Sequence, residues 1–189
     1  RNRQPEHPYN KIGNYYSRCF NVLLARATGF EGCFAPLATW QLLREIEEFR
    51  PDLIHIHSIH NSYLNVPMLF RYIKRNHIRV VWTLHDCWAF TAQCPHFTMA
   101  KCDKWKTGCH HCPQLDGYPK SYVDHSKWMY RQKKEWFCGV EDMTLVTPSQ
   151  WLAEQVKGSF LGDYPVKVIY SGIDLEIFRP TAGDFREKY

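Results

Sequence analysis

The hydrophobic and polar positions of the chain follow two different spacings. Five segments place apolar side chains three or four positions apart, which is the spacing of a helix with one buried face. These segments are residues 14–28, 38–50, 63–76, 121–140 and 150–160. Four shorter runs are continuously apolar or rich in β-branched residues, which favours strands. These runs are residues 51–58, 78–84, 143–149 and 164–174.

The order of these segments predicts an α/β fold. Two helices are followed by strands that alternate with helices, an order typical of a mostly parallel sheet. Continuously apolar strands suit a sheet covered on both faces, so we expect a Rossmann-like domain of three layers. In the first helix one face is apolar and should pack against the core; its residues are Tyr16, Phe20, Leu23, Leu24 and Ala27. Residues 94–116 fit neither spacing and are expected to form a cysteine-rich loop insertion.

Small and polar residues follow the predicted strands at the points where the strands end. Ligands of open α/β sheets bind beyond the carboxyl ends of the strands, so these residues should outline a polar cleft. The candidates for substrate binding and catalysis at these ends are Ser58, His60, Asn61, His85, Asp86, Ser171 and Gly172.

The His85–Asp86 pair is the strongest chemical candidate. The imidazole of His85 can donate to a sugar hydroxyl or a phosphate oxygen, and Asp86 can accept from hydroxyls. Alternatively, His85 bonds the neighbouring backbone and Asp86 caps a turn. Such a pair also occurs in metal-dependent phosphohydrolases, although the further His and Asp ligands that they need are not found in the sequence. His55 lies within a predicted strand, and we expect it to be a buried core residue.

Cys94, Cys102, Cys109 and Cys112 form the second candidate site. The last two flank two histidines in a CxxC pattern, which allows two thiolates to share one tetrahedral ion. A zinc ion held by four thiolates would be structural, because no coordination position stays open. The alternatives are four free thiols or two disulfides.

Composition and charge argue against several classes of protein. The chain has no run of about 18 apolar residues that would span a membrane, and residues 1–13 lack the apolar region of a secretory signal. Its net charge of +5 fits an anionic partner but not a dedicated nucleic-acid binder. The helix from Tyr122 to Cys138 mixes basic and aromatic residues, which suits either peripheral contact with an anionic membrane or a solvated basic face.

Four stretches together resemble the N-terminal half of a family 4 glycosyltransferase. They are VVWTLHDCWAFTAQC, CDKWKTGCHHCPQ, TPSQWLAEQV and VKVIYSGIDLEIFRPT. The resemblance implies a retaining enzyme of the GT-B fold that uses a nucleotide-sugar donor. The subgroup that the chain resembles is bacterial and makes surface polysaccharide of the colanic acid or capsule type.

The resemblance also implies how the chain is organised. Residues 1–180 would form the acceptor-side domain, and residues 181–189 would begin the linker to an absent C-terminal domain that binds the nucleotide sugar. His85 would contact the donor sugar, and Ser171 and Gly172 would begin the connection between the domains. The glycine-rich loop after the family's first strand and the paired glutamates of its second domain do not occur here. We therefore expect the first strand to be missing and this chain alone to be inactive.

The resulting hypothesis is that the chain is part of a cytoplasmic enzyme at the inner face of the membrane. This enzyme would transfer a sugar to a saccharide or lipid-linked acceptor in polysaccharide biosynthesis. We expect no nucleic-acid partner, and an exposed sheet edge would allow a homodimer. The alternative is a non-catalytic, zinc-stabilised interaction module that binds an anionic polymer.

Overall fold

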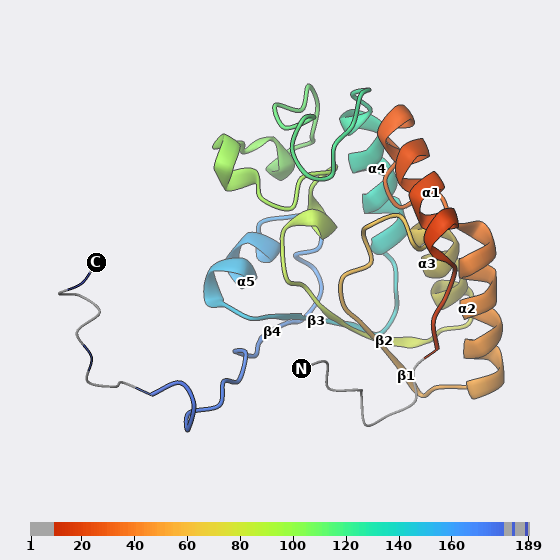
Figure 1. Cartoon of the computed structure of the whole chain (residues 1–189). Coiled ribbons are helices and arrows are strands. Elements are labelled where there is room, and N and C mark those ends of the chain that lie inside the picture. The colour runs from red at the N-terminus through yellow and green to blue at the C-terminus, as the bar shows by residue number, and fades with distance from the viewer. Residues whose placement is uncertain (1–9, 180–182, 184–187, 189) are drawn as a thin grey trace.

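Four parallel strands form the centre of the domain. A computed structural model describes residues 10–179, 183 and 188. The strands are β1 (Leu53–Ile56), β2 (Arg79–Thr83), β3 (Met143–Thr147) and β4 (Val166–Val168). They lie side by side in the order of the sequence, and every pairing is parallel. This arrangement confirms the predicted α/β class and the parallel sheet (Figure 1).

Five α-helices accompany the strands in the described residues, as the spacing predicts. They are α1 (Tyr15–Thr28), α2 (Pro36–Phe49), α3 (Val66–Arg75), α4 (Ser126–Phe137) and α5 (Gln150–Lys157). The last three each connect two neighbouring strands. Such crossovers are almost always right-handed, so connections that all advance in one direction place their helices on one face of the sheet. None of the described helices is both long and apolar enough to cross a membrane.

The core lies between this helical layer and one face of the sheet. Trp82 of β2 packs against Phe70 of α3 and Phe137 of α4, with ring centroids 5.4 and 4.8 Å away. On the opposite face of the sheet, Leu53 and His55 of β1 are exposed. The described residues therefore form two of the three expected layers, and the expectation that His55 is buried is wrong.

Helix α1 forms where predicted, but its apolar stripe does not face the core. Tyr16, Phe20 and Leu23 are 82, 59 and 59 % exposed, whereas Asn21 and Ala25 are buried. The small Ala25 side chain lets the helix lie close to its neighbours, and Asn14 caps its first turn by accepting a hydrogen bond from Ser17 N–H. Local spacing thus predicted the helix but not the face that packs.

The segment after β2 forms an insertion built from 3₁₀ turns, in green above the sheet in Figure 1. Its turns are η1 (Trp88–Phe90), η2 (Phe97–Ala100) and η3 (Lys104–Lys106). Trp105 is only 1 % exposed, and its ring lies 5.2 and 4.9 Å from those of Phe90 and Phe97. The loop therefore has a small aromatic core of its own. The predicted boundary at residue 180 and most of the linker 181–189 lie outside the described residues.

Candidate active site

The turn that follows β2 brings His85 and Asp86 to the carboxyl edge of the sheet. The parallel pairing of β1 with β2 places Ser58 and His60 at the same edge, since these residues follow β1. The four residues line one small crevice together with Trp82 and Trp88. The prediction that strand ends would gather these side chains is therefore correct for both strands.

Asp86 joins this turn to the segment after β1. Its Oδ2 lies 2.9 Å from Nε2 of His60, and its Oδ1 accepts a hydrogen bond from Trp88 N–H at 2.8 Å. Burial alone would raise the pKa of Asp86, but the hydrogen bonds from His60 and Trp88 hold the pKa below its usual range. The carboxylate is thus ionised at neutral pH, and it both caps the turn and orients the imidazole of His60.

Two residues complete this network from the far side of His60. The hydroxyl of Tyr118 lies 3.2 Å from Nδ1 of His60 and donates a hydrogen bond to Oδ1 of Asn61. Sequence reasoning did not identify Tyr118, because it lies 58 positions from His60 and carries no local motif. Asp86 contacts His60 directly, and Tyr118 adds Asn61 to this pair of predicted residues.

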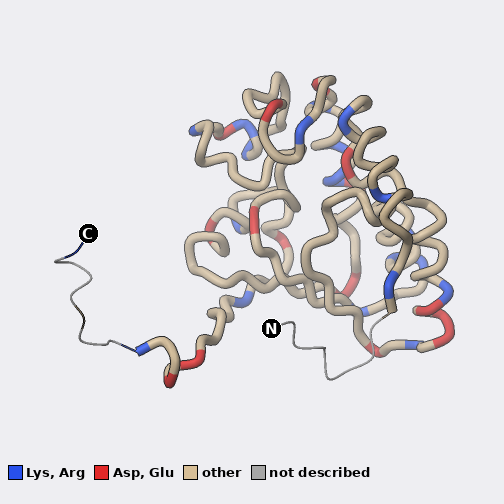
Figure 2. The backbone as a smooth tube through the Cα atoms, in the orientation of Figure 1, with Lys and Arg blue, Asp and Glu red and all other residues tan. Residues whose placement is uncertain are grey.

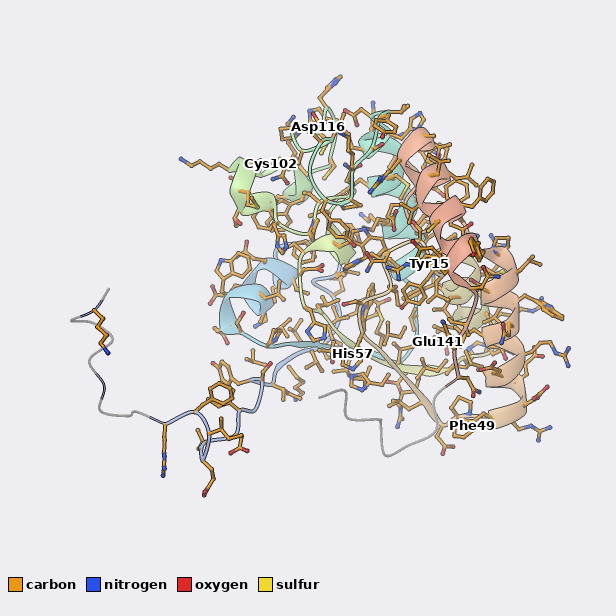
Figure 3. The ribbon with its side chains drawn as sticks, viewed as in Figure 1. Tyr15, Phe49, His57, Cys102, Asp116 and Glu141 are labelled. Atoms are coloured by element: carbon orange, nitrogen blue, oxygen red, sulfur yellow. The ribbon has the colours of Figure 1, made fainter. Side chains whose placement is uncertain are left out.

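His85 is exposed and belongs to a second group of histidines. Its Nε2 lies 2.9 Å from Nδ1 of His57, and the two rings stack at 5.3 Å. Burial, together with the neighbouring His55 and His85, lowers the pKa of His57, which favours the neutral form of this ring. A neutral His57 can share one hydrogen bond with Nε2 of His85. His85 Nδ1 has no hydrogen-bond partner among the described residues, so it can bind a ligand. Figure 3 labels His57 beside the strands.

A buried carboxylate shapes the segment from Ser58 to Ser62. Glu31 is 8 % exposed and accepts hydrogen bonds from Asn61 N–H, Ser62 N–H and the Ser62 hydroxyl at 2.8–3.0 Å. Asn61 and Ser62 have φ values of 85° and 57°, a region that side chains other than glycine occupy at a cost. Glu31 stabilises this conformation, and it is a second residue that the sequence motifs did not reveal.

The remaining predicted substrate residues contribute less to this network. Ser58 is exposed, and its carbonyl accepts a hydrogen bond from the Tyr63 hydroxyl at 2.7 Å. Ser171 and Gly172 are exposed in the segment after β4, two strands away from β2. Within the described chain, neither makes a hydrogen bond or an ion pair with the other candidates, so their predicted role in substrate binding stays a prediction.

All four cysteines of the predicted metal site line one cavity of about 20 Å³ in the insertion, the segment in which Figure 3 labels Cys102. They are free thiols. Burial raises the pKa of Cys94 to about 11 and that of Cys109 to about 12, so both are protonated at neutral pH unless a cation binds them. As they lie, no three His, Cys, Asp or Glu residues of the described chain could hold a metal ion.

His85 and Asp86 do not face a common ligand position. His85 contacts His57, whereas Asp86 contacts His60, so the two neighbours in sequence belong to different hydrogen-bonded groups. A phosphohydrolase would need both side chains on one metal ion with further ligands. The geometry instead offers an exposed imidazole beside the ionised Asp86, which is hydrogen-bonded to His60, and this arrangement suits hydrogen bonding to hydroxyl groups.

The sequence model of the protein family Glycosyltransferase Family 4 matches residues 7–177, which is most of the chain. The chain belongs to glycosyltransferase family 4. This membership agrees with the parallel α/β fold and with the resemblance that the sequence motifs indicate. The crevice at the end of β2 is therefore the candidate site of a family 4 domain.

One curated relative is the colanic acid biosynthesis glycosyl transferase WcaC of Escherichia coli (strain K12). It is 33 % identical over 132 residues, which cover 66 % of this chain and 32 % of the relative. The matched part of this family 4 chain thus spans about a third of the relative's length. No solved structure matches the chain significantly.

Proposed function

We propose that this family 4 domain is the acceptor side of a retaining glycosyltransferase. The complete enzyme would transfer a sugar from a nucleotide-sugar donor to a saccharide or lipid-linked acceptor in the biosynthesis of a bacterial surface polysaccharide. The relative named for colanic acid biosynthesis supports this class of product. The observation that carries the proposal is the turn after β2, where an exposed His85 lies beside an ionised Asp86.

The residues divide into a donor group and an acceptor group. His85, supported by His57, has a ring nitrogen available for a hydroxyl of the donor sugar. Asp86, His60 and Asn61, joined through Tyr118, present acceptors and donors of hydrogen bonds to the acceptor sugar. In a retaining transfer of this kind, the protein mainly positions the substrates and stabilises the departing diphosphate.

The donor's nucleotide would bind to a second domain outside this chain. This part of the proposal follows from the family's two-domain organisation and from the lack of paired glutamates in the sequence. The 189-residue chain, incubated with nucleotide sugars and an acceptor, should release no nucleoside diphosphate. Release by the chain alone would mean that the donor site lies within it.

The role of His85 can be tested in a full-length enzyme that contains this domain. His85→Ala should lower kcat about 100-fold, the effect of losing one well-placed hydrogen-bond donor near the reacting group. His77→Ala is the matched control. His77 lies in the turn before β2, at the opposite edge of the sheet, and pairs there with Glu141, which precedes β3. The melting temperatures of both variants should stay near that of the wild type. Near-normal turnover of His85→Ala would reject this role.

A basic groove supports contact with an anionic, membrane-bound acceptor at the cytoplasmic face. The groove has a volume of about 600 Å³ and lies between α4 and the insertion. Its basic lining residues are His110, His111, Lys127, Arg131 and Lys134. No acidic residue lines it, and none of these side chains forms an ion pair within the described chain. Elsewhere, basic and acidic positions are interspersed along the backbone (Figure 2).

The edge of β1 supports the association of two copies. Among the described residues, β1 pairs with β2 along one edge and with no strand along the other. An unpaired edge of this kind can join another copy of itself. Light scattering after size exclusion should then give twice the chain's 22.5 kDa, and a monomer mass would exclude this dimer.

A further inference from the structure

The insertion gathers four cysteines from a stretch with little regular structure. Between Cys94 and Cys112 the chain forms only the 3₁₀ turns η2 and η3. The residue before each of the last three cysteines has a positive φ: Lys101 at 48°, Gly108 at 147° and His111 at 44°. These tight turns direct Cys102, Cys109 and Cys112 back toward Cys94. All four thiols consequently line the same cavity of about 20 Å³, which is room for one atom-sized occupant.

A buried lysine side chain lies near this cavity. Lys133 of α4 is 0 % exposed, and its Nζ donates a hydrogen bond to the carbonyl oxygen of Trp88 and lies 3.4 Å from the centre of the Trp88 ring. It has no ion-pair partner among the described residues. Burial lowers the pKa of Lys133 to about 7, and negative charge at Cys109, Asp86, Cys94 and Glu31 opposes this shift. Thiolates at Cys109 and Cys94 would therefore add to the compensating charge that Asp86 and Glu31 supply.

One hydrogen-bond donor at the cavity lacks an acceptor. Trp105 lines the cavity, and its buried Nε1 has no partner in the described structure. A metal-bound thiolate would offer an acceptor, since groups around metal ligands typically bond to them and orient them.

We propose that the four cysteines of this cavity, Cys94, Cys102, Cys109 and Cys112, bind one structural zinc ion through their thiolates. Four sulfur ligands of this kind select zinc by softness and tetrahedral geometry. The complex has a net negative charge, which favours the charged form of the nearby Lys133. No coordination position stays open, so the ion stabilises the fold and takes no part in sugar transfer.

Binding requires the sulfur atoms to move toward one another, because no three potential ligands of the described chain are yet arranged around an ion. The movement would break no helix or strand, since the cysteines lie in loops and turns. Zinc binding would also fix the segment that follows Cys112. The backbone N–H of Cys112 already donates a hydrogen bond to Asp124 at 2.9 Å. That segment carries Tyr118, so the ion would hold this residue against His60 and Asn61.

The test measures the metal content of the 189-residue chain purified under reducing conditions. We expect one zinc per chain by plasma emission spectrometry, released by a mercurial that titrates the thiols. Replacement by Co²⁺ should give the intense visible bands of a tetrahedral cobalt–thiolate complex. These two measurements use the unaltered chain, so they do not depend on the folding of any variant.

Variants then assign the ligands. Cys109→Ser and Cys112→Ser should each lower the zinc affinity at least tenfold, measured by competition with a chromophoric chelator. Cys138→Ser and Cys19→Ser are matched controls outside the cavity, and both should retain one zinc per chain. The proposal is overturned if the wild-type chain binds no zinc, if the cobalt form lacks thiolate bands, or if the control variants lose the ion as well.

Discussion

At the scale of single residues, Asp86 connects the ionisation of the candidate site to the stability of the domain. Its side chain is 19 % exposed and is bonded on both oxygens, to His60 and to the backbone of Trp88. Its folded-state pKa lies below the ordinary value. A carboxyl group with a lowered pKa stabilises the fold above its unfolded pKa of about 3.9, and this contribution is lost as the pH falls through the folded-state value.

We therefore expect Asp86→Asn to lower the free energy of unfolding by about 1.5–3 kcal/mol at pH 7, the range for hydrogen bonds to a charged group. The difference from the wild type should shrink as the pH falls below about 4, because the wild-type carboxylate is then protonated. Urea denaturation across this pH range measures both effects. Asp103→Asn is the control, since within the described residues the Asp103 side chain forms only an exposed pair with Lys106. An Asp86→Asn deficit that does not change with pH would contradict this account.

The sequence predicted the neighbourhood of Asp86 only in part. Strand ends in a parallel sheet meet at one edge, so the gathering of His60, His85 and Asp86 followed from their positions after two strands. Glu31 and Tyr118 reach the same site from the connection before α2 and from the segment that follows the insertion. Their positions depend on how loops fold back over long separations in sequence. No local pattern encodes such contacts, so only the structure revealed them.

At the scale of elements, the segment from Ser58 to Ser62 depends on a single buried carboxylate. Glu31 accepts three hydrogen bonds from Asn61 and Ser62, whose backbones adopt positive φ values. Glu31→Gln keeps the shape of the side chain but replaces one acceptor oxygen with an NH₂ group that faces a donor. We expect a loss of about 1–3 kcal/mol in the free energy of unfolding, measured by urea denaturation.

Glu48→Gln provides the comparison for this prediction. Glu48 forms an exposed pair with Arg44 in α2 at 3.5 Å, and such pairs contribute about 0–1 kcal/mol. Equal effects of the two substitutions would show that Glu31 does not stabilise the segment. A larger effect at Glu31 should also broaden the NMR signals of Asn61 and Ser62, because a freed segment exchanges between conformations.

Helix α1 shows why an element can be predicted while its packing is not. A helical period fixes which side chains share a face, but it does not fix where the rest of the protein lies. Tyr16, Phe20 and Leu23 satisfied the pattern of a buried stripe, yet the helix contacts the domain through Asn21 and Ala25. By contrast, the cap of α5 is purely local: Ser149 precedes the helix and accepts the hydrogen bond from Leu152 N–H, as a serine in that position typically does.

At the scale of the whole molecule, the order of the strands decides which surfaces are free. Four strands in sequential order place their connecting helices on one side, which leaves His55 and Leu53 exposed on the other. The alternation of helices and strands could not predict this, because it is compatible with several strand orders. The same layout directs α4 and the insertion to one end of the domain, where the basic groove forms between them.

The groove gives a prediction about the domain as a whole. If its cations contact an anionic membrane, the chain should bind vesicles containing phosphatidylglycerol more tightly than vesicles of phosphatidylcholine, and added salt should weaken this binding. Each Lys or Arg near such a surface contributes about 1 kcal/mol, so the double variant Arg131→Gln/Lys134→Gln should bind roughly 30-fold more weakly in a sedimentation assay. Arg71→Gln/Arg75→Gln on α3 removes the same charge outside the groove and should have a smaller effect. Equal losses in the two double variants would mean that net charge, and not the groove, governs the contact.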